Sequence, residues 1–163
     1  MKLRRMAAAL LLWTGSLTAA DAACPIEFAV YQSADSKTAI DFTPNHNVGA
    51  SVTNSFRLVM QDGIIPGHVQ WSEQPASRSF GSLMLDCPEG DATGEELAVC
   101  TIWQGVIYIV EADGAAGLLP EQGKPAPRRL LFSGLGPALA AAPSFKKSNL
   151  PASDFFQLSG CQE

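Results

Sequence analysis

Apolar and polar residues alternate in short runs along much of the chain, a pattern typical of β-strands. Residues 26–31 and 39–43 alternate on either side of a turn at 34–36, which predicts a β-hairpin. Turn-forming glycine, proline and aspartate residues separate most of the remaining runs. Further strands are predicted at 69–72, 80–85, 106–110, 117–119 and 130–132.

Three segments carry helix signals instead. The apolar residues of 51–60 recur at helical spacing. Residues 97–104 follow a capping box formed by Thr93 and Glu96, but they are also rich in β-favouring residues, so helix and strand are both open. A short helix is predicted at 137–142, which begins with proline and continues with alanine and leucine. Together these elements predict an α+β fold, a single domain with mostly antiparallel sheet and a few short helices.

The first residues of the chain carry a pattern of their own. Three basic residues precede an apolar run at 6–12, and the small residues Ala20 and Ala22 offer a cleavage site after Ala22. The apolar run is shorter than the roughly 20 residues that a membrane-spanning helix requires. We therefore predict that residues 1–22 are a cleavable secretion signal and that the protein is periplasmic or secreted.

Residues 23–163 are then the mature chain, whose length suits one domain. This part holds no other segment long and apolar enough to predict a transmembrane helix. A lipid anchor at Cys24 is an alternative, because alanines precede this cysteine as in part of a lipobox. Asp21 stands where that motif requires an apolar residue, which favours a protein without the anchor.

The net negative charge of the chain bears on which partners it can bind. The formal net charge is −5, and loss of the signal removes three basic residues and one acidic residue, which leaves −7. An acidic protein repels phosphate backbones, so nucleic acid is not an expected partner. The two basic pairs, Arg128-Arg129 and Lys146-Lys147, are interpreted as surface residues.

The chain has four cysteines, and an even number in an exported protein predicts two disulfides. Three pairings are possible, of which we favour Cys24–Cys161 with Cys87–Cys100. The first would tie the two ends of the mature domain together, and the second would close a short loop rich in turn residues. A zinc site is disfavoured because the cysteine spacings contain no C-x-x-C pair.

Few residues suggest catalysis, and we assign no catalytic, cofactor-binding or metal-binding residue and no cofactor. His46 and His68 are interpreted as ordinary loop or surface histidines, since no metal or hydrolase motif accompanies them. Carboxylates crowd the loop 86–96, where glycosidase chemistry and calcium binding are the functional alternatives to a solvated surface. The acidic residues of this loop are Asp86, Glu89, Asp91, Glu95 and Glu96.

Four short motifs resemble those of a set of small exported proteobacterial proteins of uncharacterised function. The resemblance implies an exported single domain and brings no activity, substrate or site residue with it. The motifs are Cys87-Pro88-Glu89-Gly90-Asp91, Thr93-Gly94-Glu95-Glu96-Leu97, Trp103-Gln104-Gly105 and Leu158-Ser159-Gly160-Cys161.

These observations favour a non-enzymatic binding or interaction module whose partner is an unidentified envelope protein or component. The reason is that the exported, acidic domain shows no paired nucleophile and base. A small periplasmic hydrolase built on the acidic loop with His46 or His68 is the first alternative. A calcium-stabilised module is the second.

Overall fold

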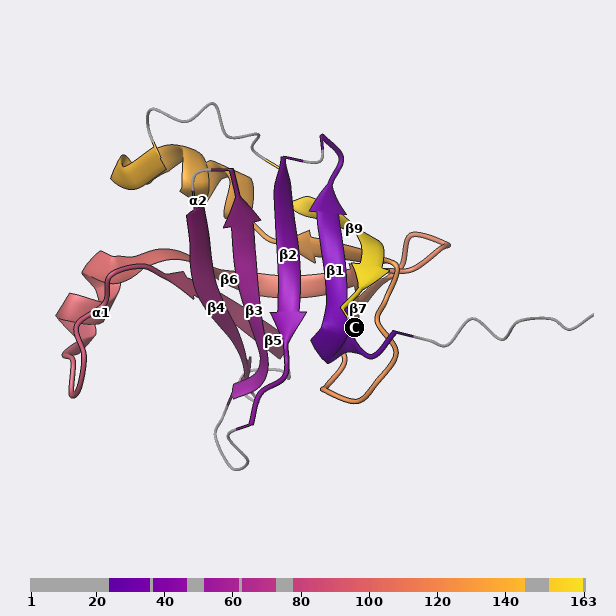
Figure 1. The fold of residues 1–163 in the computed structure, drawn as a ribbon, viewed down its shortest axis with the longest axis horizontal. Helices are drawn as coiled ribbons and strands as arrows, with labels where there is room; N and C mark the ends of the chain where they lie inside the picture. The colour runs from indigo at the N-terminus through magenta and orange to yellow at the C-terminus, as the bar shows by residue number, and fades with distance from the viewer. Residues whose placement is uncertain are drawn as a thin grey trace, which may run out of the picture.

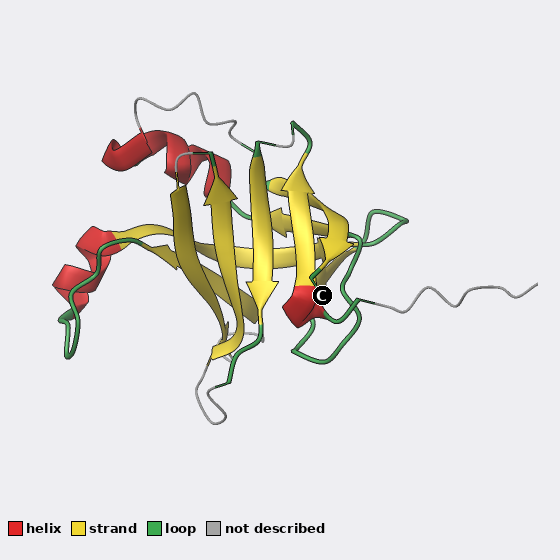
Figure 2. Cartoon of the chain, viewed as in Figure 1, coloured by secondary structure: helices red, strands yellow, loops and turns green. Residues whose placement is uncertain are grey.

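The computed structural model describes residues 24–35, 37–46, 52–61, 63–72, 78–145 and 153–162. Within these residues, eight antiparallel strands close into a barrel, to which one short extra strand and two α-helices are attached (Figure 1, Figure 2). The predicted secretion signal and the pair Lys146-Lys147 lie outside the described residues. No helix in the described part of the chain is long and apolar enough to span a bilayer.

The barrel is ordered β5-β4-β3-β2-β1-β9-β8-β6, and pairing of β5 with β6 completes the ring. The short strand β7 extends the sheet beside the second half of β6. The strands are β1 (Ala29–Ser33), β2 (Thr38–Thr43), β3 (Val52–Met60), β4 (Gly63–Ser72), β5 (Arg78–Met84), β6 (Thr101–Val110), β7 (Ala116–Leu118), β8 (Arg129–Phe132) and β9 (Phe155–Cys161). The helices are α1 (Gly94–Cys100) and α2 (Leu135–Ala141), with 3-10 turns η1 (Ile26–Phe28) and η2 (Pro143–Phe145).

The predicted α+β class is wrong, because the fold is a closed, mostly β barrel. The segment 51–60 shows how the sequence pattern misled. Its apolar residues fit helical spacing, yet the described part of this segment forms β3 and alternates between buried and half-buried positions. A polar residue, Asn54, occupies one buried position and an apolar residue, Val59, an outward one, so the period of two is obscured.

Other elements were predicted more closely. The predicted helix at 137–142 is α2, displaced by one to two residues, and the predicted hairpin is β1–β2 preceded by the turn η1. Residues 97–104 are divided between the two structures that the sequence left open. The first part is helical, since α1 ends at Cys100, and the rest is strand, since β6 begins at Thr101. The change of structure falls where Thr101 pairs with Met84 of β5.

Aromatic rings fill the barrel interior. An eight-stranded barrel is just wide enough for side chains to occupy its centre or for one small ligand to bind there. Phe132 is fully buried, and its ring centroid lies 5.6 Å from Phe56, 5.6 Å from Trp103 and 5.4 Å from Phe156. Phe42 continues this chain of rings, 5.8 Å from Phe56. The centre of the barrel is therefore occupied by its own side chains.

Both ends of the barrel are covered. At one end, α2 packs Leu135 and Leu139 against the core. At the other end, the segment 119–127 bonds to several strands: the Asn54 side-chain amide donates to the Pro120 carbonyl at 3.5 Å, and the Tyr31 hydroxyl donates to the Pro127 carbonyl at 2.8 Å. Burial raises the pKa of Tyr31, so this hydroxyl stays protonated and available as a donor.

The large rings fit because small residues face them. A Cβ atom added to Gly67 would lie 2.5 Å from Cζ of Phe56 and 2.9 Å from Cδ2 of Leu83. One added to Gly81 would lie 2.7 Å from Cδ1 of Ile107. Such distances are too short for non-bonded carbons, so each glycine provides room that a neighbouring side chain fills.

We expect Gly67→Ala to lower the free energy of unfolding by about 1–3 kcal/mol, because the added methyl group overpacks the interior. Urea unfolding would measure the change. Gly160→Ala on β9 is the matched control, since nothing lies within 4 Å of its Cβ position. Equal stability of the two variants would show that the rings can move aside.

Candidate functional site

The segment between β5 and β6 projects from one side of the barrel (Figure 1). We call residues 86–100 the acidic arm. Two links close its base: the Leu85 N–H donates to the Cys100 carbonyl at 3.0 Å, and a disulfide joins Cys87 to Cys100. The arm is thus an outgrowth of one strand connection, held by a covalent bond where it leaves the barrel.

Helix α1 lies within the arm and begins with the predicted capping box. The Thr93 hydroxyl accepts from the Glu96 N–H at 3.3 Å, and the Glu96 carboxylate accepts from the Thr93 N–H at 2.8 Å. The N–H and hydroxyl of Thr93 lower the pKa of Glu96, because both donate to its ionised form. At the other end of the helix, the Thr101 hydroxyl donates to the Leu97 carbonyl at 2.7 Å.

The acidic arm carries concentrated negative charge. All five of its acidic residues are exposed, and its sequence contains no basic residue. No group of three histidine, cysteine, aspartate or glutamate side chains within the described ranges is placed to hold a metal ion. The structure therefore adds no support to the calcium interpretation. The negative charge of the arm lies on the surface, where it attracts cationic groups.

The two histidines lie outside the arm. His46 is exposed in the segment that follows β2, and His68 lies on β4 with Ser55 and Ser82 as its partners across the strands. Burial lowers the pKa of His68, which favours the neutral imidazole. Neither histidine lines the groove beside the arm that is described below, so that groove does not bring a histidine together with the carboxylates of the arm.

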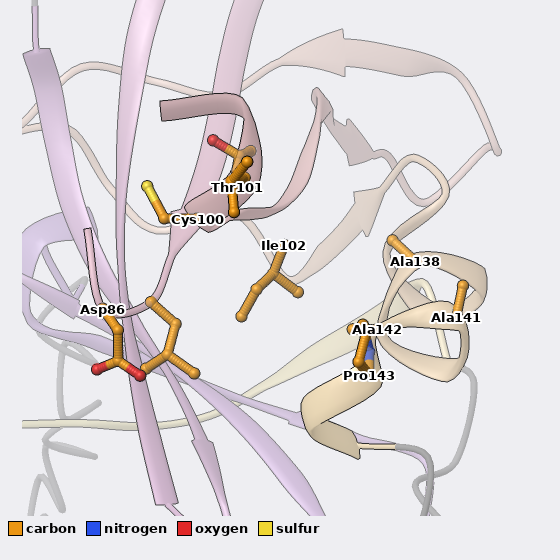
Figure 3. A pocket seen from close by; sticks show the side chains of 10 residues that line it. Asp86, Cys100, Thr101, Ile102, Ala138, Ala141, Ala142 and Pro143 are labelled. Carbon is orange, nitrogen blue, oxygen red and sulfur yellow. The ribbon is translucent and has the colours of Figure 1, made fainter. Parts of the chain in front are cut away.

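A groove of about 330 Å³ lies between the base of the acidic arm and α2 (Figure 3). Asp86 stands at one side of this groove and Ala138, Ala141 and Ala142 at the other, with Ile102 between them (Figure 3). Most of its lining residues have apolar side chains, but polar atoms make up about half of its surface, and the Thr101 hydroxyl is already bonded within the chain. The carboxylate of Asp86 is the charged group in this lining.

Helix α2 is fixed in place as one wall of the groove. The Asp154 carboxylate accepts from the Gly134 N–H at 3.0 Å and from the Gly136 N–H at 2.6 Å, which satisfies donors at the start of the helix. Leu135 and Leu139 anchor the opposite face in the core. The small alanine side chains therefore face the groove and leave it open.

Sequence reasoning missed this groove. It predicted the α2 helix and the acidic loop separately, but no pattern placed them side by side. One signal was available: the alanines of 138–142 add apolar surface on a helix face that Leu135 and Leu139 do not occupy. A second feature, the 86% exposure of Val99 at the groove, could not be read from the sequence.

The structure pairs Cys24 with Cys161 and Cys87 with Cys100, the arrangement favoured from the sequence. The Cys24–Cys161 disulfide joins the residues just before β1 to the end of β9, with Cα atoms 5.7 Å apart. A sulfur atom held in a disulfide cannot also carry a lipid thioether. The structure therefore speaks against the lipid anchor considered at Cys24.

A second hollow, of about 590 Å³, lies where β6 ends and β8 begins. Arg128 and Arg129, predicted to be surface residues, line it together with Glu111. The guanidinium of Arg129 donates to the backbone carbonyl of Glu111. This basic hollow is distinct from the groove beside the acidic arm, with which it shares no lining residue.

Comparison of the chain with protein-family models, curated proteins and solved structures returned no match. No relative therefore supplies a function or a set of site residues for this chain. The functional inference rests on the barrel, the acidic arm and the groove.

We expect loss of the Cys87–Cys100 disulfide to loosen the acidic arm more than the barrel. In Cys87→Ser/Cys100→Ser, amide hydrogen exchange within the arm should accelerate by about 100-fold, since closing a loop of this size contributes about 3 kcal/mol. The control, Cys24→Ser/Cys161→Ser, should leave exchange in the arm unchanged. Slow exchange in the first variant would show that other contacts hold the arm.

We also expect the order of α1 to depend on pH. The pKa of Glu96 in the folded arm lies below its ordinary value of 4.5. Its stabilising effect is therefore present above pH 4.5 and is lost as the pH falls through the lowered pKa. Carbon-13 chemical shifts of α1 and of the Glu96 carboxyl, recorded during acidification, would show both changes together.

The variant Thr93→Ala removes one of the two donors to Glu96 and provides the control for this titration. In this variant the pKa of Glu96 should move back toward 4.5 but not reach it, because the backbone N–H of residue 93 still donates to the Glu96 carboxylate. A titration identical to that of the unaltered chain would exclude a role for the Thr93 hydroxyl.

Proposed function

We propose that this chain is an exported, non-enzymatic binding module that contacts a protein of the cell envelope through its acidic arm. One observation carries the proposal: the arm projects from the barrel, is closed at its base by a disulfide, and exposes five carboxylates. A projecting segment that is already ordered loses less conformational entropy on binding than a free loop would.

The barrel supports this proposal by what fills it. Its aromatic rings occupy the centre, and α2 and the segment 119–127 cover its ends. Recognition therefore falls to the outer surface, where the arm and the adjacent groove are the most distinctive features.

The charge of the arm defines the chemistry of the proposed partner. A surface rich in lysine or arginine would be attracted to the five carboxylates, and the attraction would speed association at low ionic strength. Exposed ion pairs contribute little individually, so the arm would act through several contacts at once.

Export is part of the proposal. Disulfides form and persist in oxidising compartments, and the two disulfides of this chain are compatible with a location outside the cytoplasm. The predicted secretion signal at 1–22 supports the same location, and the periplasm is the compartment we favour.

The proposal is tested by co-purification from the native host, with the tagged chain crosslinked at native level and its partners identified by mass spectrometry. Glu89→Gln/Glu95→Gln should reduce recovery of the main partner by about two- to thirtyfold, as expected for the loss of two exposed ion pairs. Glu111→Gln/Glu121→Gln removes the same charge at exposed positions away from the arm and should leave recovery unchanged. Equal recovery with both variants would refute the proposal.

A further inference from the structure

We propose that the groove between the acidic arm and α2 receives one lysine or arginine side chain of the partner, flanked by apolar residues. The inference rests on the proposed function, since the partner is the basic protein that the arm contacts. It goes further because it names the groove that binds the partner, the type of residue that enters the groove and the apolar residues that flank it in the partner sequence.

The size and lining of the groove favour a long side chain. At about 330 Å³, the groove lies at the lower end of the range for ligand sites, so it suits one or two side chains better than a large cofactor. The side chains of Leu85, Ile102 and the α2 alanines are apolar and stand beside polar atoms that make up about half of the groove surface. Lysine and arginine bury their aliphatic stems on such walls while the charged group stays near water.

Asp86 supplies the charge that selects a basic residue. It borders the groove opposite the α2 alanines (Figure 3) and is exposed, so an incoming ammonium or guanidinium group could pair with it without full desolvation. Its backbone is left-handed, with φ of 55°, a conformation that aspartate and asparagine tolerate better than most residues. Asp86→Asn therefore removes the charge while the backbone geometry is kept.

Val99 explains why apolar neighbours are expected in the partner. It is 86% exposed, far more than any other large apolar residue among the described core and surface, and it lies at the groove on the last turn of α1. Pro143 is exposed on the α2 side. Apolar residues on either side of the inserted lysine or arginine would cover Val99 and Pro143.

Charge also argues against a second copy of this chain as the occupant. A symmetric contact between two copies would bring two arms together, each with five carboxylates, and like charges oppose such a contact. A head-to-tail contact, with the arm of one copy at the Arg128-Arg129 hollow of another, is the arrangement in which charges would match. Light scattering on the purified chain at low salt tests this: a monomer is expected, and self-association lost in Arg128→Gln/Arg129→Gln would overturn the proposal.

The decisive test uses short peptides with a central Leu-Lys-Leu, Leu-norleucine-Leu or Leu-Glu-Leu. Each is titrated into the isotope-labelled chain, and NMR shifts of Ile102, Ala138 and Ala141 amides report on the groove. We expect the lysine peptide to bind about two- to fivefold more tightly than the norleucine peptide, the range for one exposed ion pair. Asp86→Asn should abolish this difference, and the glutamate peptide should bind most weakly.

A filled groove provides the matched control. Ala141→Phe should remove the groove shifts, whereas Ala140→Phe adds the same ring at an exposed position of α2 outside the groove and should leave them intact. Peptide shifts confined to the arm carboxylates, or unaffected by Ala141→Phe, would overturn the proposal.

The crosslinking experiment separates failure of this inference from failure of the proposed function. If Glu89→Gln/Glu95→Gln loses the native partner and Ala141→Phe retains it, the arm binds but the groove does not, and only the groove inference fails. If both variants retain the partner, both proposals fail. Loss in Ala141→Phe with retention in Ala140→Phe supports the groove.

Discussion

The packing of aromatic rings around Phe132 is the contact on which the rest of the structure depends. Its ring touches side chains from three other strands, and those strands can approach it only because glycines such as Gly67 and Gly81 leave room on the neighbouring ones. An interior filled in this way holds the strands at fixed positions around the ring. It also occupies the space in which other eight-stranded barrels hold a ligand, and the proposed function therefore uses the outer surface.

The outside features are built on two rigid supports. One is the β5–β6 connection, where a disulfide and the Leu85–Cys100 hydrogen bond close the base of the acidic arm. The other is α2, fixed by Asp154 at its start and by Leu135 and Leu139 in the core. The groove lies between these supports. Each support fixes one wall of the groove, and the two walls therefore stay a constant distance apart.

Much of the local structure could be predicted from the sequence, but the closure of the strands into a barrel could not. The capping box at Thr93 and Glu96 is a matter of neighbouring residues, and α2 follows from local propensity in the same way. The barrel depends on pairing between distant strands, and β3 was obscured because buried Asn54 breaks its apolar pattern. The groove joins two segments about forty residues apart in the chain, and no local signal encodes that distance.

The neighbouring positions of β1 and β9 have a consequence for how the molecule comes into being. Among the described strands β1 comes first in the chain and β9 last, and the disulfide beside them spans 137 residues of sequence. The ribosome makes β9 after the other barrel strands, so the barrel cannot close until β9 is available. Until then β1 presents an edge of unpaired N–H and C=O groups to its surroundings. The unclosed chain is thus most exposed to strand-mediated aggregation before β9 pairs with β1, and the Cys24–Cys161 disulfide then makes the closure permanent.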